Sequence, residues 1–227
     1  MISLLVLVSC RQERNTLEIK FSRVDSTNTE AVTIYDLEIK NSDSVFFYKP
    51  RYHYAAESRL KFDSLPDGKY EVKFLDILNK RKVRKFSLKE DENKIVEIAF
   101  DSIDIQKFID KAPISNLNNG EYYRVERKGG SIATGYGYYL ITKKNDSFYI
   151  DSPYRSRKTL TKDQIETVAK FEAELLAING ANVCMSTGRM HYNIINNGKV
   201  IEITDNTCNW SGWRTLMSQI PIDEDIE

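Results

Sequence analysis

The side chains best suited to catalysis are two histidines and a few carboxylates near them. His191 lies in an alternating run, and Asp205 follows the next such run. A histidine beside a carboxylate can act as a general base, so one reading is an envelope hydrolase that uses His191. His53 lies between aromatic and basic residues and is expected at the surface. No nucleophile elbow, zinc-protease or phosphate-loop sequence is present. We therefore expect no catalytic residue, no metal, no cofactor and no enzymatic activity.

Two of the three cysteines bracket a predicted hairpin. Asn197-Gly198 is a strong hairpin turn signal. If residues 196 and 199 pair, Cys184 and Cys208 come close together just beyond the open end of the hairpin. In an oxidising compartment this predicts a disulfide that contributes about 3 kcal/mol. The alternatives are a zinc pair, which would need two further ligands, or a catalytic thiol, which would need a nearby histidine.

The third cysteine follows a short apolar segment. Residues 1–9 are uncharged and end in a small side chain directly before Cys10, and the chain then turns polar at Arg11. Leu7-Val8-Ser9-Cys10 resembles the lipobox of bacterial lipoproteins, although no basic residue opens the segment. The resemblance implies a signal peptide and a Cys10 that carries enough acyl chains, such as palmitate, for durable anchoring. The alternative is a buried N-terminal strand with a free thiol.

Two surface features could bind a partner. The first is a dense basic run on a predicted hairpin, formed by Lys80, Arg81, Lys82, Arg84 and Lys85. It could bind anionic lipid headgroups or an acidic partner, or it could be a solvated edge that blocks aggregation.

The second feature is a cluster of tyrosines. Because neighbouring strand residues point to opposite faces, Tyr136 and Tyr138 share one face and Tyr139 takes the other. Exposed tyrosines suit the recognition of a protein or a glycan. The alternative is that these tyrosines fill the core of a small sheet.

Composition removes several classes of protein. The chain has 227 residues, of which 41% are hydrophobic, so it is neither disordered nor a polytopic membrane protein. Its 33 basic and 33 acidic residues give a formal net charge of zero. A nucleic-acid partner is therefore not expected.

The elements that must position these residues fall into two domains. Residues 17–100 contain seven short alternating runs separated by turns, which predicts an antiparallel β-sandwich. The stretch Leu65-Pro66-Asp67-Gly68-Lys69-Tyr70-Glu71-Val72 resembles a turn of prealbumin-like sandwiches, such as carboxypeptidase-regulatory and adhesin B-type domains. That resemblance implies a non-catalytic sandwich.

The sequence pattern of residues 121–222 predicts a small α+β domain. A capping box at Thr161 and Gln164 begins its main helix and Gly180 ends it, while Glu172 interrupts the apolar stripe. A second helix is expected near the end of the domain. The remaining segments are predicted as a signal peptide (1–9), a lipidated tether (10–16), a linker with a short helix (101–120) and an acidic tail (223–227).

These features together predict a lipid-anchored, non-enzymatic binding or docking module of the cell envelope. Because no acidic run follows Cys10, we expect an outer-membrane lipoprotein that faces the periplasm. Its partner would be another envelope protein, in an outer-membrane complex, or a glycan. The alternatives are the hydrolase that uses His191 and an inhibitor or immunity-type lipoprotein.

Overall fold

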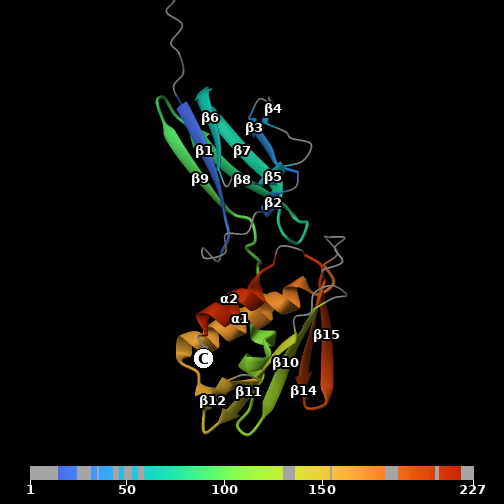
Figure 1. The fold of residues 1–227 in the computed structure, drawn as a ribbon. Helices are drawn as coiled ribbons and strands as arrows, with labels where there is room; N and C mark the ends of the chain where they lie inside the picture. Colours follow the sequence, from blue (N-terminus) through green and yellow to red (C-terminus); the bar gives the residue numbers. More distant parts are fainter. Residues whose placement is uncertain are drawn as a thin grey trace, which may run out of the picture. The chain divides into compact units, whose positions relative to one another are not determined.

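A computed structural model shows a mainly β protein made of two compact units (Figure 1). The first unit comprises residues up to 76 together with 80–100, and the second comprises 77–79 together with residues from 101 onward. The structure describes residues 15–24, 32–34, 36–42, 46–48, 53–55, 59–129, 136–153, 155–181, 189–207 and 210–220.

The described strands of the first unit form a three-stranded sheet, a four-stranded sheet and a two-stranded ribbon. Their orders are β6-β1-β9, β4-β3-β7-β8 and β2-β5. The strands are β1 (Asn15–Ser22), β2 (Val32–Ile34), β3 (Glu38–Asn41), β4 (Phe46–Tyr48), β5 (His53–Ala55), β6 (Arg59–Leu65), β7 (Gly68–Leu75), β8 (Arg81–Leu88) and β9 (Asn93–Ala99).

Alternating apolar residues give the first unit its core. Leu17 and Ile19 on β1 are almost fully buried, as are Tyr70 and Val72 on β7 in the other sheet. Burial alternates along both strands, so each sheet directs one face inward. The predicted sandwich is confirmed. One pairing differs from the antiparallel expectation, because β1 pairs with β9 in parallel.

Three segments of the first unit are joined where β1 begins. The Asn15 side-chain amide donates to the Asp67 carboxylate (2.7 Å), and its oxygen accepts from the Glu92 backbone N–H (2.8 Å). The Tyr70 hydroxyl donates to the Pro66 carbonyl (2.7 Å). The Pro66-Asp67-Gly68 turn and the start of β9 are therefore fixed beside the start of β1.

The second unit is an antiparallel sheet whose one face carries two helices. The described strands follow the order β13-β12-β11-β10-β14-β15. They are β10 (Tyr122–Gly129), β11 (Tyr136–Lys144), β12 (Ser147–Ser152), β13 (Arg155–Thr159), β14 (Met190–Asn196) and β15 (Lys199–Asp205). The predicted hairpin register is confirmed, because Asn196 pairs with Lys199.

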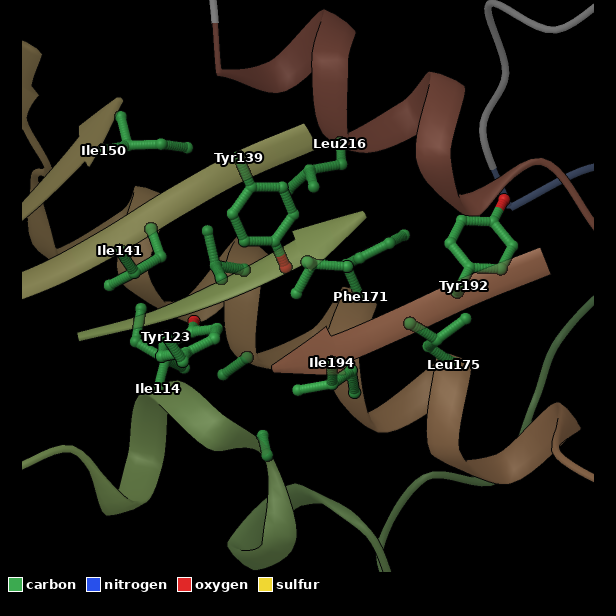
Figure 2. Packing of buried hydrophobic residues seen from close by; sticks show 14 of the residues in the cluster. Ile114, Tyr123, Tyr139, Ile141, Ile150, Phe171, Leu175, Tyr192, Ile194 and Leu216 are labelled. Atoms are coloured by element: carbon green, nitrogen blue, oxygen red, sulfur yellow. The ribbon is translucent and has the colours of Figure 1, made fainter. Parts of the chain in front are cut away.

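The main helix, α1 (Lys162–Ile178), begins at the predicted capping box, which is confirmed. The Thr161 backbone N–H donates to the Gln164 side chain (3.0 Å), and the Gln164 N–H donates to the Thr161 hydroxyl (3.3 Å). The second helix, α2 (Gly212–Gln219), packs beside α1. Figure 2 shows Phe171 and Leu175 of α1 packed among buried side chains of the strands.

The stretch 101–120 is part of the second unit, so its prediction as a linker is wrong. Ala112, Ile114 and Leu117 are nearly inaccessible and belong to the core beneath α1. The short helix expected in this stretch is present as two 3-10 helices, η1 (Ile109–Lys111) and η2 (Pro113–Asn116). In the sequence, polar residues separate these three apolar side chains, so their burial against α1 was not predicted.

Candidate functional site

The predicted catalytic pair is not assembled. On β14 and β15, His191 lies opposite Thr204, whereas Asp205 lies opposite Met190. Because neighbouring residues on a strand point to opposite faces, the His191 and Asp205 side chains lie on opposite sides of the sheet. His191 Nδ1 lies 3.1 Å from the Thr204 hydroxyl. The hydrolase reading therefore loses its histidine–carboxylate pair.

Asp205 instead stabilises the chain that leaves β15. Its Oδ1 accepts from both the backbone N–H (2.8 Å) and the hydroxyl (2.7 Å) of Thr207. Burial raises the pKa of Asp205, and the two bonds from Thr207 oppose that shift. The Thr207 hydroxyl in turn accepts from the Trp210 N–H (3.1 Å). This carboxylate therefore has a structural partner rather than a catalytic one.

Metal sites and membrane spans are also absent from the described part of the chain. No group of three or more His, Cys, Asp or Glu residues could hold a metal ion there. No helix in that part is both long and apolar enough to cross a bilayer.

Several predictions lie outside the described residues. They are the Cys10 anchor with its preceding segment, both cysteines of the predicted disulfide (Cys184 and Cys208) and the acidic tail. The side chain of His53 is also outside them. These remain predictions.

The structure divides the predicted basic run between two faces of β8. Lys85 lies opposite Glu71, whereas Arg84 lies opposite the buried Val72 and Lys82 lies opposite Phe74. Lys82 Nζ also forms an ion pair with Asp76 (3.3 Å). The run is therefore not one continuous surface. Lys80 and Arg81 lie where the β7–β8 hairpin turns, and Lys85 lies further along the strand.

Lys85 instead joins lysines of neighbouring strands in a groove that we call the lysine groove. It has a volume of about 580 Å³. It is lined by Lys40, Asn41, Ser42, Lys69, Tyr70, Glu71, Lys85, Phe86 and Ser87. The strands β7 and β8 contribute three residues each, β3 contributes Lys40 and Asn41, and Ser42 directly follows β3. The four-stranded sheet therefore gathers lysines that are far apart in the sequence.

One carboxylate holds two lysines at this groove. Glu71 Oε1 lies 3.0 Å from Lys40 Nζ and 3.1 Å from Lys73 Nζ. Hydrogen bonds from Lys40 and Lys73 lower the pKa of Glu71, and the bond to Glu71 raises the pKa of Lys40. Glu71 and Lys40 therefore both stay charged near neutral pH. Lys69 and Lys85 are exposed and form no ion pair among the described residues.

The second candidate surface is the sheet face of the second unit that lies opposite α1, here called the tyrosine face. Tyr122 is 58% exposed and Tyr136 is 52% exposed, whereas Tyr123 and Tyr139 are fully buried on the helix side. The predicted division of Tyr136 from Tyr139 is confirmed. The Tyr136 and Tyr138 rings lie 6.1 Å apart. No helix covers this face in the part of the chain that the structure describes.

Charged groups on the tyrosine face are already paired. The Arg124 guanidinium lies 5.7 Å from the centre of the Tyr138 ring and 2.6 Å from a Glu126 oxygen. Lys128 Nζ lies 3.6 Å from the other oxygen of Glu126, which is only 6% exposed. Paired charges hold the Arg124 and Tyr138 side chains in place. This face therefore combines exposed aromatic rings with ordered charges, of which one net positive charge remains.

Glu172 has a structural role that its sequence pattern did not reveal. It is fully buried, and its oxygens accept hydrogen bonds from the Tyr123 hydroxyl, the Tyr139 hydroxyl (3.0 Å) and the Ile114 N–H (3.0 Å). Burial raises its pKa to about 7, although the three donors act in the opposite direction. Glu172 is therefore the polar centre of a packed core. Its place in the apolar stripe was the available signal, but its partners were not evident.

Comparison with known protein families finds no family model that matches this chain. Comparison with curated proteins finds no match either.

Proposed function

We propose that this protein is a lipid-anchored cell-envelope protein that docks another envelope protein through its tyrosine face, without catalysing a reaction. Cys10 would hold it at the outer membrane on the periplasmic side, as the lipobox resemblance implies. The observation that carries the docking role is the tyrosine face itself. A uniformly solvated sheet face would not require exposed aromatic rings, and tyrosine and arginine are enriched at protein interfaces.

The charge pattern favours a protein partner over a polyanion. Arg124 and Lys128 share the single carboxylate of Glu126, so these three groups leave only one net positive charge, which is little attraction for a polyanion. Rigid aromatic rings lose little conformational entropy when they bind. A glycan partner is the competing outcome, because tyrosine rings also stack on sugars.

The docking test uses site-specific photo-crosslinking in cells that produce the full chain. A crosslinking side chain is placed at Tyr136, at Tyr122 and, as a control on the helix side, at the exposed Lys170. We expect the same protein to be captured from both tyrosine positions and not from Lys170. Capture from all three positions, or from none, would contradict docking through this face.

Affinity then decides whether that contact is specific. The captured protein is purified, and its Kd is measured for the parent chain and for the variant Tyr136→Ala/Tyr138→Ala. Loss of two interface rings is expected to weaken binding by at least about tenfold, as for typical interface anchors. An unchanged Kd would overturn the docking role of the face, and binding of an envelope glycan alone would assign the face to sugars.

The anchor has a separate test. Cys10→Ala should abolish incorporation of labelled palmitate and release the protein from the membrane fraction. Unchanged processing and membrane retention would rule out lipidation at Cys10.

A further inference from the structure

The lysine groove lies near the end of the sandwich where β1 begins. Asn15, the first residue of β1, bonds to Asp67, and Lys69 follows two residues later at the start of β7. Lys69 lies opposite Ser87 near the end of β8. The two strands that carry Lys69 and Lys85 therefore meet the start of β1 at the same end of the unit.

Chain length keeps that end close to position 10. Five residue steps separate Cys10 from Asn15. An extended chain spans at most about 3.6 Å per residue, so these steps cover no more than about 18 Å. If Cys10 carries a lipid, the groove end of the sandwich cannot move far from the headgroup layer of that membrane.

We propose that the lysine groove binds the anionic phospholipid headgroups of the membrane that holds Cys10, a proposal that rests on the lipid anchor proposed above. Three lysines and one glutamate line the groove, so its charge complements a phosphate-rich surface. Lys69 and Lys85 supply the attraction, because the Glu71 carboxylate is already shared by Lys40 and Lys73.

The form of the groove favours a lipid surface over one soluble phosphate. Its lysines come from three neighbouring strands, and Lys69 and Lys85 are exposed, whereas a site for a single phosphate surrounds the ion with converging donors. Lysines act as point charges that interact with many headgroups at once, and this attraction vanishes beyond about one Debye length of 8 Å. In the cell, the anchor would keep the groove within this range of the headgroups and so add to an attraction that the groove has by itself.

The test measures binding of the full chain, carrying Cys10→Ala in every sample, to lipid vesicles. One set contains phosphatidylcholine with phosphatidylglycerol, and the other contains phosphatidylcholine alone. We expect binding to the anionic vesicles that falls as salt rises. Lys69→Gln/Lys85→Gln should weaken it by about 30-fold, which corresponds to about 1 kcal/mol per lysine near an anionic surface.

The matched control is Lys80→Gln/Arg81→Gln, which removes the same charge from exposed positions of the same unit. Both residues lie where the β7–β8 hairpin turns, at the opposite end of β7 from Lys69. The control should bind within about twofold of the parent, because charges beyond a Debye length contribute little. Equal losses in both variants would show an effect of net charge alone and overturn the assignment to the groove.

Two further results would overturn the proposal. One is equal binding of the Lys69→Gln/Lys85→Gln variant and the parent to anionic vesicles. The other is displacement from vesicles by inorganic phosphate at constant ionic strength, which would indicate a soluble phosphate ligand. The assay contains no lipidated protein, so it is independent of the anchor test. If Cys10 is acylated but Lys69→Gln/Lys85→Gln leaves vesicle binding unchanged, only the inference about the groove fails. If Cys10 is not acylated, the proposed anchor fails.

Discussion

Glu71 and Glu172 are the same side chain in opposite circumstances. In the first unit, Glu71 lies at the lysine groove between two ammonium groups, and their hydrogen bonds lower its pKa. In the second unit, Glu172 is surrounded by neutral donors in a core without access to water, and burial raises its pKa to about 7. A partner of opposite charge keeps one ionised, whereas lost solvation favours the neutral form of the other. The first sets the charge of a surface, and the second organises a fold.

The largest effect is expected from Glu172→Ala. This change leaves the Ile114 N–H and the hydroxyls of Tyr123 and Tyr139 without their acceptor in a dry core. Unsatisfied buried donors and the new cavity together should lower the free energy of unfolding of the second unit by about 4 kcal/mol. Urea unfolding monitored by tryptophan fluorescence measures this, because both tryptophans, Trp210 and Trp213, belong to that unit. Glu71→Ala should leave this transition unchanged.

The second prediction concerns pH. The pKa of Glu172 is raised in the folded state from an ordinary value of 4.5 to about 7. Its stabilising contribution is therefore complete below about pH 4.5 and is lost as pH rises through 7, a change of about 3 kcal/mol. Glu174 and Asp205 also have raised pKa values and act in the same direction. Urea unfolding midpoints of the second unit, measured from pH 5 to pH 8, show how steeply its stability falls with pH.

Glu172→Gln isolates this contribution. The amide is neutral at every pH, and when its oxygen faces Ile114 it can accept the N–H while its nitrogen donates toward the tyrosine oxygens. The variant should show a clearly flatter dependence of stability on pH than the parent. If stability depends on pH equally steeply in the parent and in the variant, Glu172 does not titrate in this range.

Glu71 should show the opposite sign and a smaller effect. Its pKa is lowered, so the stability that it contributes is present above its ordinary pKa of 4.5 and is lost as pH falls through the lowered value. Glu71→Gln should return the pKa of Lys40 toward its ordinary value, which carbon-detected NMR of the lysine side chain can follow. It should also tighten binding to anionic vesicles severalfold, since it removes a negative charge from the groove. Looser binding would contradict the role given to that charge.

The smallest effect on stability is expected at the tyrosine face. Tyr136 is half exposed, so Tyr136→Ala should change the free energy of unfolding of the second unit by less than about 0.5 kcal/mol. Tyr139→Ala removes a fully buried ring from the opposite face of the same strand and should cost about 4 kcal/mol. A large loss of stability in Tyr136→Ala would mean that this ring serves the fold rather than a partner.

Local patterns predicted much of this fold, because they depend on residues close in sequence. The hairpin register followed from Asn197-Gly198, and the start of α1 followed from Thr161 and Gln164. The placement of Tyr136 and Tyr139 on opposite faces of the sheet followed from strand alternation alone, but which face is buried did not. The same alternation, applied to residues 80–85, would have divided the basic run between two faces.

The remaining features depend on pairings between distant residues. The lysine groove requires β3 to pair with β7, which brings Lys40 beside Glu71. Glu172 finds its acceptor role only after α1 packs on residues 33 to 58 positions away in the sequence. A helical pattern shows that Glu172 breaks an apolar stripe, but it contains no information about the donors on the opposite layer.

The parallel pairing of β1 with β9 determines how the sandwich would resist mechanical force. The chain enters the unit at the start of β1 and leaves it at the end of β9, and the two strands pair from Thr16 with Asn93 to Ser22 with Ala99. These two points lie at opposite ends of the pair. Tension between an anchored N-terminus and a loaded second unit would shear all of the ladder's hydrogen bonds at once instead of opening them one by one. The parallel register therefore places the β1–β9 ladder in a shear geometry with respect to its two outer ends.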